Sequence, residues 1–155
     1  MDKKIVYVDM DGVLVDLVGW VNKNYLPEYI ESTGIGNIVD MNAMAFYDPE
    51  PIKDAIESFN NLCKNPNFDV WILSTAPWAN PEAWKAKRIW VENNLGPGAY
   101  KRLILTHNKS LMKGDYLIDD RDSNGASDFE GEHIKFGKEG FETWKEVITY
   151  LTTNS

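Results

Sequence analysis

The chain of 155 residues is long enough for one domain with a hydrophobic core and a small insertion. Its formal net charge of −8 excludes a general nucleic-acid binder, because such a protein needs a basic surface to displace counterions from phosphates. No apolar run approaches the roughly 20 residues that span a bilayer, and the first residues lack the pattern of a secretory signal peptide. The single cysteine, Cys63, cannot form an intrachain disulfide. We therefore expect a cytoplasmic protein with neither a nucleic-acid polymer nor a membrane as its partner.

The first predicted element is a short strand from Lys4 to Asp9. Its β-branched and aromatic residues are typical of a buried strand, and it ends in an acid. Gly12 then allows a turn. From Leu14 to Val21 the apolar residues recur at helical spacing, which predicts a helix soon after the strand.

The next segment gives a weaker pattern. Between Asn24 and Pro51, prolines, glycines and an aspartate break the chain into short pieces. We interpret this segment as two short helices, which belong to a small helical cap formed by residues 16–48. This cap is inserted into a core that consists of residues 1–15 and 49–155.

The remaining sequence alternates between helical and strand patterns. Helices are expected from Pro51 to Leu62, from Pro77 to Leu95 and from Phe141 to Leu151. Strands are expected at residues 68–75, 102–106, 116–120 and 133–136. Strands that alternate with helices indicate an α/β fold, in which a parallel sheet carries helices on both faces.

Polar side chains follow four of these strands at the point where each strand ends. They are Asp9 and Asp11, Ser74 and Thr75, Lys109, and Asp119 and Asp120. In parallel sheets, ligands bind beyond the carboxyl ends of the strands. Carboxylates gathered at one edge repel one another unless a cation lies among them. Mg²⁺ is a cation that such oxygen ligands favour, and no Cys/His cluster supports zinc instead.

Each of these motifs alone has an ordinary structural explanation. An Asp-x-Asp-Gly sequence after a strand often forms a turn or a helix N-cap, and hydroxyls often close turns. A lone lysine is usually a solvated charge. The placement of all of them at consecutive strand ends is what predicts a catalytic or phosphate-binding site. His107 and His133 are poor candidates for catalysis.

Four sequence motifs resemble those of the haloacid dehalogenase (HAD) superfamily of phosphatases. They are Asp9-Met10-Asp11-Gly12-Val13-Leu14, Leu73-Ser74-Thr75, a downstream lysine, and Ile118-Asp119-Asp120-Arg121. Longer strings resemble the cytosolic-type 5′(3′)-deoxyribonucleotidases within that superfamily. Those strings are Asp9 to Asp16, Ser74-Thr75-Ala76-Pro77, Trp90-Val91-Glu92, and Leu117-Ile118-Asp119-Asp120-Arg121. The resemblance implies a Rossmann-like three-layer sandwich with a parallel sheet, and a small helical cap inserted after the first strand.

The resemblance also implies catalytic and metal-binding roles. Asp9 is the expected nucleophile, which forms an aspartyl-phosphate. Asp11 is the expected general acid toward the leaving alkoxide and then the base for the attacking water. Mg²⁺ is expected to be held by the Asp9 carboxylate, the Asp11 backbone carbonyl and Asp120, with Asp119 as an outer or alternative ligand.

The phosphate-binding residues are assigned by the same resemblance. Thr75 aligns best with the family's phosphate-binding hydroxyl, and Ser74 is the alternative. For the lysine that neutralises the phosphate, the register of Trp90-Val91-Glu92 points to Lys87, whereas strand-end position points to Lys109. We rank Lys87 first and keep both as candidates.

Substrate contacts are the least defined part of the site. Mammalian-type relatives carry an aromatic residue just after the first motif, where this chain has Leu17. Trp20, Phe46 and Trp78 are the candidates for supplying aromatic contacts instead.

The expected activity is Mg²⁺-dependent dephosphorylation of (deoxy)ribonucleoside monophosphates through an aspartyl-phosphate. The expected partner is a deoxynucleoside monophosphate, and the oligomeric state is left open, with a homodimer as one option. An alternative is a HAD phosphatase that acts on a sugar phosphate or another small phosphometabolite. A signalling receiver domain has similar groups, but there the acidic pair comes early in the chain, whereas here Asp119 and Asp120 come late.

Overall fold

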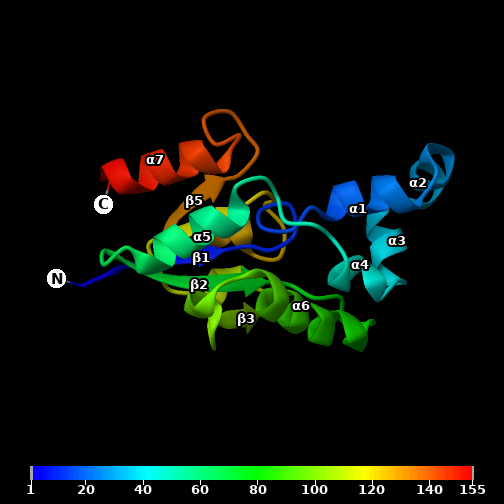
Figure 1. The fold of residues 1–155 in the computed structure, drawn as a ribbon, viewed down its shortest axis with the longest axis horizontal. Helices are drawn as coiled ribbons and strands as arrows, with labels where there is room; N and C mark the ends of the chain where they lie inside the picture. Colours follow the sequence, from blue (N-terminus) through cyan, green and yellow to red (C-terminus); the bar gives the residue numbers. More distant parts are fainter. Residues whose placement is uncertain (1, 155) are drawn as a thin grey trace.

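A single sheet of five parallel strands forms the centre of the computed structural model, which describes residues 2–154 (Figure 1). The strands are β1 (Lys4–Val8), β2 (Phe68–Ser74), β3 (Leu103–Leu105), β4 (Tyr116–Asp119) and β5 (Glu132–Lys135). They lie side by side in the order β3-β2-β1-β4-β5. The predicted parallel α/β fold is therefore confirmed.

Three long helices cover one face of the sheet (Figure 1). They are α5 (Ala55–Lys64), α6 (Pro81–Asn94) and α7 (Trp144–Asn154). Buried Val6 and Val8 of β1 share one core cluster with Phe59 of α5, Trp90 of α6 and Trp144 of α7. No helix among residues 2–154 is long and apolar enough to cross a membrane.

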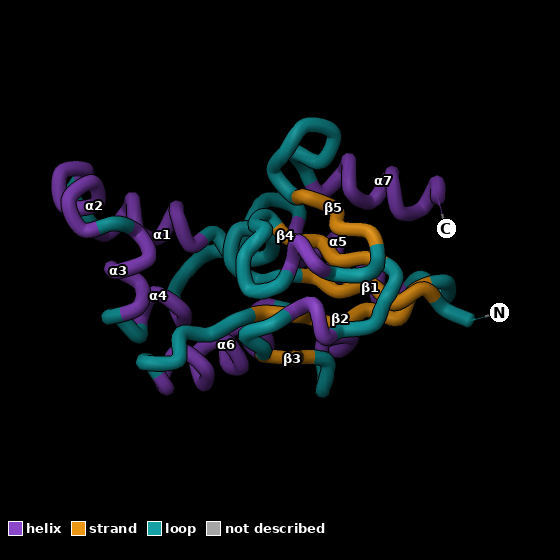
Figure 2. Tube along the Cα trace, turned by 180° about the vertical axis from the view of Figure 1, so that it is seen from behind, coloured by secondary structure: helices purple, strands orange, loops and turns teal. Residues whose placement is uncertain are grey.

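The opposite face of the sheet is covered by loops and short 3₁₀ turns, as Figure 2 shows from behind. Tyr7 of β1 and Leu117 of β4 pack there against Phe129 and against Ala126 of η3 (Ala126–Asp128). A second 3₁₀ turn, η2 (Lys109–Leu111), follows β3, whereas η1 (Pro97–Ala99) packs in the core of the helix-covered face. Helices were predicted on both faces; the second outer layer differs because the connections from β3 to β4 and from β4 to β5 hold only the 3₁₀ turns η2 and η3.

A helical lobe follows β1 and lies beyond one end of the sheet (Figure 1). It contains α1 (Leu17–Asn24), α2 (Pro27–Thr33), α3 (Ile35–Asp40) and α4 (Met44–Tyr47). The lobe has its own core, in which Leu17, Val21 and Phe46 pack with Ala83 and Ala86 of α6. The expectation of two short helices after Asn24 was wrong, because three are present. The first two are separated at Gly34, whose positive φ of 84° ends α2 and is readily adopted by glycine.

The lobe is joined to the sheet by two paired segments. Val15 and Pro51 form an antiparallel bridge, and the Ile52 amide donates to the Leu14 carbonyl at 2.8 Å. This pairing holds Pro51 in extended backbone, so α5 begins at Ala55 rather than at the predicted Pro51.

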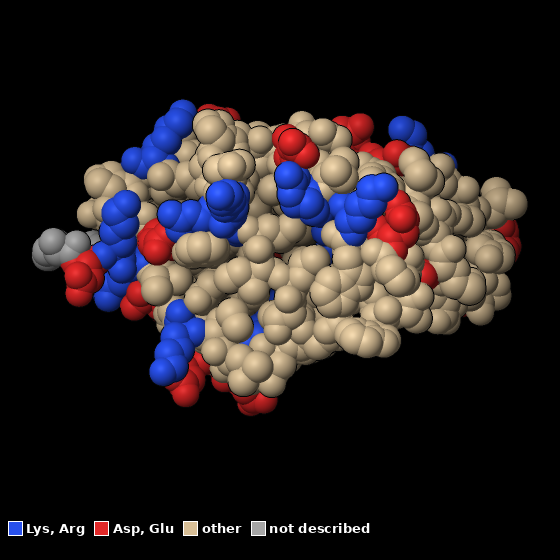
Figure 3. Space-filling view, turned by 90° about the horizontal axis from the view of Figure 1, so that it is seen from below, with Lys and Arg blue, Asp and Glu red and all other residues tan. Residues whose placement is uncertain are grey.

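The surface charge is not uniform. The chain has 24 acidic and 16 basic residues, yet several Lys and Arg side chains lie across the face seen from below, with Asp and Glu side chains beside some of them (Figure 3). A net negative charge therefore leaves room for locally positive surface, which an anionic ligand needs.

Candidate active site

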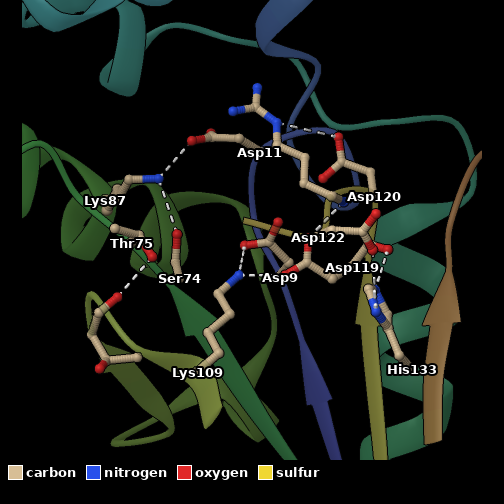
Figure 4. Close-up of polar contacts among 12 residues, drawn as sticks. Asp9, Asp11, Ser74, Thr75, Lys87, Lys109, Asp119, Asp120, Asp122 and His133 are labelled. Atoms are coloured by element: carbon tan, nitrogen blue, oxygen red, sulfur yellow. Dashed lines mark hydrogen bonds and ion pairs between the residues drawn. The ribbon is translucent and has the colours of Figure 1, made fainter. Parts of the chain in front are cut away.

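The predicted site residues converge at the carboxyl edge of the sheet (Figure 4). The sheet order reverses at β1, because β2 lies on one side of it and β4 on the other, and ligands bind at such switch points. A small pocket of about 60 Å³ is found at this edge. It is lined by Asp9, Asp11, Ser74, Thr75, Lys109, Asp119, Arg121, Ser123 and Asn124. Ser123 and Asn124 were missed from the sequence because they belong to a loop with no motif of its own.

Lys109 lies between two buried carboxylates. Its Nζ atom is 3.0 Å from Oδ1 of Asp9 and 2.6 Å from Oδ2 of Asp119. Burial raises the pKa of Asp9 to about 8; Lys109 opposes this shift, and the charges of Asp119 and Asp11 add to it. Burial also acts to lower the pKa of Lys109, but the two carboxylates outweigh it, so that the pKa is raised. Lys109 is therefore a stable positive charge beside Asp9.

A second buried lysine contacts the other aspartate of the first motif. The Nζ atom of Lys87 on α6 lies 2.8 Å from Oδ2 of Asp11 and donates to Oγ of Ser74 at 3.0 Å. The neighbouring hydroxyl of Thr75 donates instead to the Thr106 carbonyl at 2.7 Å. The two candidate lysines thus contact different carboxylates, Lys87 that of Asp11 and Lys109 those of Asp9 and Asp119.

Three carboxylates form a cluster suited to a metal ion. Asp9, Asp119 and Asp120 each offer an oxygen, and these oxygens lie within 4.8 Å of one another. Both Asp119 oxygens already accept hydrogen bonds, Oδ1 from the Arg121 amide and Oδ2 from Lys109. Oδ1 of Asp120, in contrast, is buried and has no hydrogen-bond partner. A buried carboxylate oxygen without a partner is costly, so this donor set fits a hard cation.

Burial is also the main cause that raises the pKa of Asp120, and the charge of Asp119 adds to it. Gly12 makes room for this carboxylate: a Cβ atom there would lie 2.1 Å from Oδ2 of Asp120. The φ angle of 79° at Gly12 is a second reason for glycine at this position.

The four candidate substrate-contact residues have different surroundings. Leu17 and Phe46 are buried in the core of the helical lobe, and Trp20 packs against it. Trp78 is 80% exposed and contacts the rings of Trp84 and His107 at centroid distances of 6.4 and 5.9 Å. Trp84 on α6 was missed because a ring contact between a helix and a loop leaves no signal in the sequence. His107, a poor candidate for catalysis, lies beside Trp78 instead.

Comparisons with known proteins agree on the family. The model of a family described as 5′ nucleotidase, deoxy (pyrimidine), cytosolic type C matches residues 3–146. A Vibrio phage KVP40 protein described as a 5′(3′)-deoxyribonucleotidase is 50% identical over 99% of this chain and 88% of its own length. The human cytosolic-type 5′(3′)-deoxyribonucleotidase is 29% identical over 84% of this chain and 78% of its own.

A solved structure shares the fold. The protein described as HAD-hydrolase YfnB from Bacillus subtilis, crystallised with magnesium, superposes with a TM-score of 0.63. The match covers 97% of this chain and 99% of that one, at 9% sequence identity. It supports the HAD-like fold.

Proposed function

The chain belongs to the cytosolic type C family of deoxy (pyrimidine) 5′ nucleotidases, and from that premise we propose its substrate, its cofactor and the roles of its residues. It is a phosphomonoesterase of the HAD type that dephosphorylates deoxynucleotides. The substrate we propose is a pyrimidine deoxynucleoside monophosphate, the cofactor is Mg²⁺, and the location is the cytoplasm. The observation that carries this proposal is the buried Asp9–Lys109–Asp119 group beside the unpartnered oxygen of Asp120.

Asp9 is the nucleophile of the proposed reaction. A carboxylate oxygen of Asp9 attacks phosphorus, the ester P–O bond breaks, and the leaving alkoxide takes a proton from Asp11. Water then attacks the phosphorus of the aspartyl-phosphate and gives a proton to Asp11, which releases phosphate and restores Asp9. Lys109 favours the ionised form of Asp9 that the first step requires.

Asp9, Asp120 and the backbone carbonyl of Asp11 would hold Mg²⁺. When bound, the ion offsets the repulsion between these carboxylates and the phosphate. Asp119 already has both oxygens hydrogen-bonded, which supports an outer role, in which it orients Lys109.

Hydrogen-bond directions support Ser74 as the first phosphate donor. Ser74 accepts from Lys87, so its own O–H remains free to donate. The O–H of Thr75 is already given to the Thr106 carbonyl. We therefore place Ser74 before Thr75, and Lys109 before Lys87, in contacting the phosphate.

The helical lobe is the proposed cap, residues 16–48, over a core of residues 1–15 and 49–155. Trp78 is the proposed contact to the base, because it is the exposed aromatic residue among the four candidates, on the loop directly after Ser74 and Thr75. Its ring contacts those of Trp84 and His107, which also contact each other at a centroid distance of 5.6 Å. Base–aromatic stacking of this kind tolerates different bases.

Phosphate release with Mg²⁺ from a panel of nucleoside monophosphates and sugar phosphates tests the proposal. The expected preference is for pyrimidine deoxynucleoside monophosphates, and Asp9→Asn is expected to reduce activity to background. Asp40→Asn, an exposed carboxylate on α3, is the control and should keep full activity. Activity retained by Asp9→Asn contradicts the nucleophile, and a preference for sugar phosphates favours the alternative substrate class.

A further inference from the structure

Lys87 is a charged residue that is almost completely buried, with 1% of its surface exposed. Its Nζ atom contacts Oδ2 of Asp11 at 2.8 Å and Oγ of Ser74 at 3.0 Å. The same atom lies 5.2 Å from the centre of the Phe46 ring. Figure 4 shows the Asp11 side chain turned toward Lys87, while Lys109 points to Asp9.

A buried ammonium group is unfavourable unless its surroundings replace the lost water. Here a carboxylate, a hydroxyl and an aromatic face do so. The Asp11 side chain is 23% exposed, so the ion pair with Lys87 limits its rotation in a partly open site.

We propose that Lys87 is a positioning residue, which holds the Asp11 carboxylate in the orientation needed for proton transfer. Through its contact with Phe46, Lys87 also links this orientation to the cap. This inference rests on the proposed function, because it assumes that Asp11 is the general acid and base. It assigns Lys87 a role apart from phosphate neutralisation, which Lys109 performs through its contact with Asp9.

Phe46 connects this pair to the helical lobe. It lies on α4 with 4% of its surface exposed, packed in the core of the lobe, and its ring lies beside Nζ of Lys87 on α6. A movement of α4 that displaced Phe46 would remove the aromatic side of the Lys87 environment. The Lys87 ammonium group therefore links the orientation of Asp11 to the packing of the cap.

A double-mutant cycle tests this role. Lys87→Met is expected to lower kcat with a pyrimidine deoxynucleoside monophosphate, whose alkoxide leaving group must be protonated, roughly 10²-fold, the size of effect that misplacing a catalytic group produces. In an Asp11→Asn background the same change should lower kcat less than about twofold, because the group that Lys87 positions is already gone. Lys85→Met is the matched control, since Lys85 is exposed on the same helix and forms an ion pair with Glu82 at 3.8 Å, so its kcat should be unchanged.

Inhibition by inorganic phosphate separates positioning from phosphate binding. The inhibition constant of Lys87→Met should stay within about twofold of the wild type, whereas Lys109→Met should raise it at least about tenfold. A raised constant for Lys87→Met, or an equal loss of kcat in both backgrounds, overturns the proposal. Should Lys87→Met fail to fold, Phe46→Leu replaces it, with an expected loss of about 3- to 10-fold that disappears in the Asp11→Asn background. A wild-type protein without phosphatase activity would instead overturn the proposed function itself.

Discussion

Lys109 and Asp9 form a buried ion pair, with Nζ of the lysine 3.0 Å from Oδ1 of the aspartate. The two residues are 100 positions apart in the chain. They meet because Asp9 directly follows the end of β1 and Lys109 begins the η2 turn, and both lie at the carboxyl edge of the sheet. Burial alone favours the protonated form of Asp9, whereas a nucleophile must be ionised. The positive charge of the lysine therefore favours the ionised form of Asp9, which can act as a nucleophile.

The stability of the metal-free protein is expected to depend on pH through Asp9. The pKa of Asp9 is raised from 3.8 to about 8 in the folded state, mainly by burial, so between these values the folded chain keeps a proton that the unfolded chain has lost. Wild-type stability should therefore fall relative to Asp9→Asn as the pH rises through this window, by at most about 1.4 kcal/mol per pH unit. Urea unfolding in EDTA, followed by tryptophan fluorescence, measures this difference. A gap between the two proteins that is constant with pH would show that Asp9 does not titrate in this window.

Removal of Mg²⁺ should stop the reaction, and addition of Mg²⁺ should restore it. Asp120 should contribute more than Asp119 to the affinity for Mg²⁺. Asp120→Asn is expected to weaken Mg²⁺ binding at least about tenfold, because Oδ1 of Asp120 is the buried oxygen without a partner. Asp119→Asn should weaken it less and instead lower stability by about 1–3 kcal/mol, because Lys109 loses its closer carboxylate. Calorimetric titration of EDTA-treated protein with Mg²⁺, together with urea unfolding, separates the two effects. The reverse ranking of the two variants in Mg²⁺ affinity would contradict the ligand assignment.

Gly12→Ala should damage the metal site without replacing any of the proposed metal ligands. The added Cβ would meet Oδ2 of Asp120 at 2.1 Å, and the φ of 79° disfavours alanine. We expect lower Mg²⁺ affinity and a loss of stability of about 1 kcal/mol or more. The control is Gly36→Ala in α3, where a Cβ meets nothing within 4 Å and alanine is the better helix former. Equal Mg²⁺ affinity in both variants would contradict the role given to Gly12.

Much of the fold was predictable because its strands are buried and end in recognisable residues. The run before Asp9 and the run before Asp119 are nearly continuous apolar segments, which is the pattern of a central parallel strand. The bridge of Val15 with Pro51 was not predictable, because pairing between segments so far apart has no local pattern. The proline therefore appeared to begin a helix.

The same limit applies to the site. Strand ends indicated which carboxylates and hydroxyls gather at one edge, but not which group bonds to which. Lys87 meets Asp11 across 76 positions of sequence, and its preference for Asp11 and Ser74 follows from where α6 passes the sheet edge. Sequence position identified both lysines as candidates for the site. Which carboxylate each lysine contacts is determined by the packing of the helix against the sheet.

Trp78 is expected to determine how well the base of the substrate binds. Its ring is 80% exposed, contacts the rings of Trp84 and His107, and lies on the loop that follows Ser74 at the end of β2. Loss of base–aromatic stacking costs about 1–3 kcal/mol, so Trp78→Ala should raise KM for a pyrimidine deoxynucleoside monophosphate about tenfold. The kcat should change little, because the ring does not contact Asp9 or Asp11.

A substrate without a base provides the control for this prediction. For 2-deoxyribose 5-phosphate, Trp78→Ala and the wild type should have the same KM, because that substrate has no ring to stack. Tyr100→Ala removes an aromatic residue of similar exposure, 74%, just before β3 at the opposite edge of the sheet, and it should leave KM unchanged for both substrates. A rise in KM for both substrates would mean that Trp78 supports the phosphate site. No rise for either would mean that the base is bound elsewhere, and the lobe aromatics Trp20 and Phe46 would then become the candidates, after a movement that uncovers them.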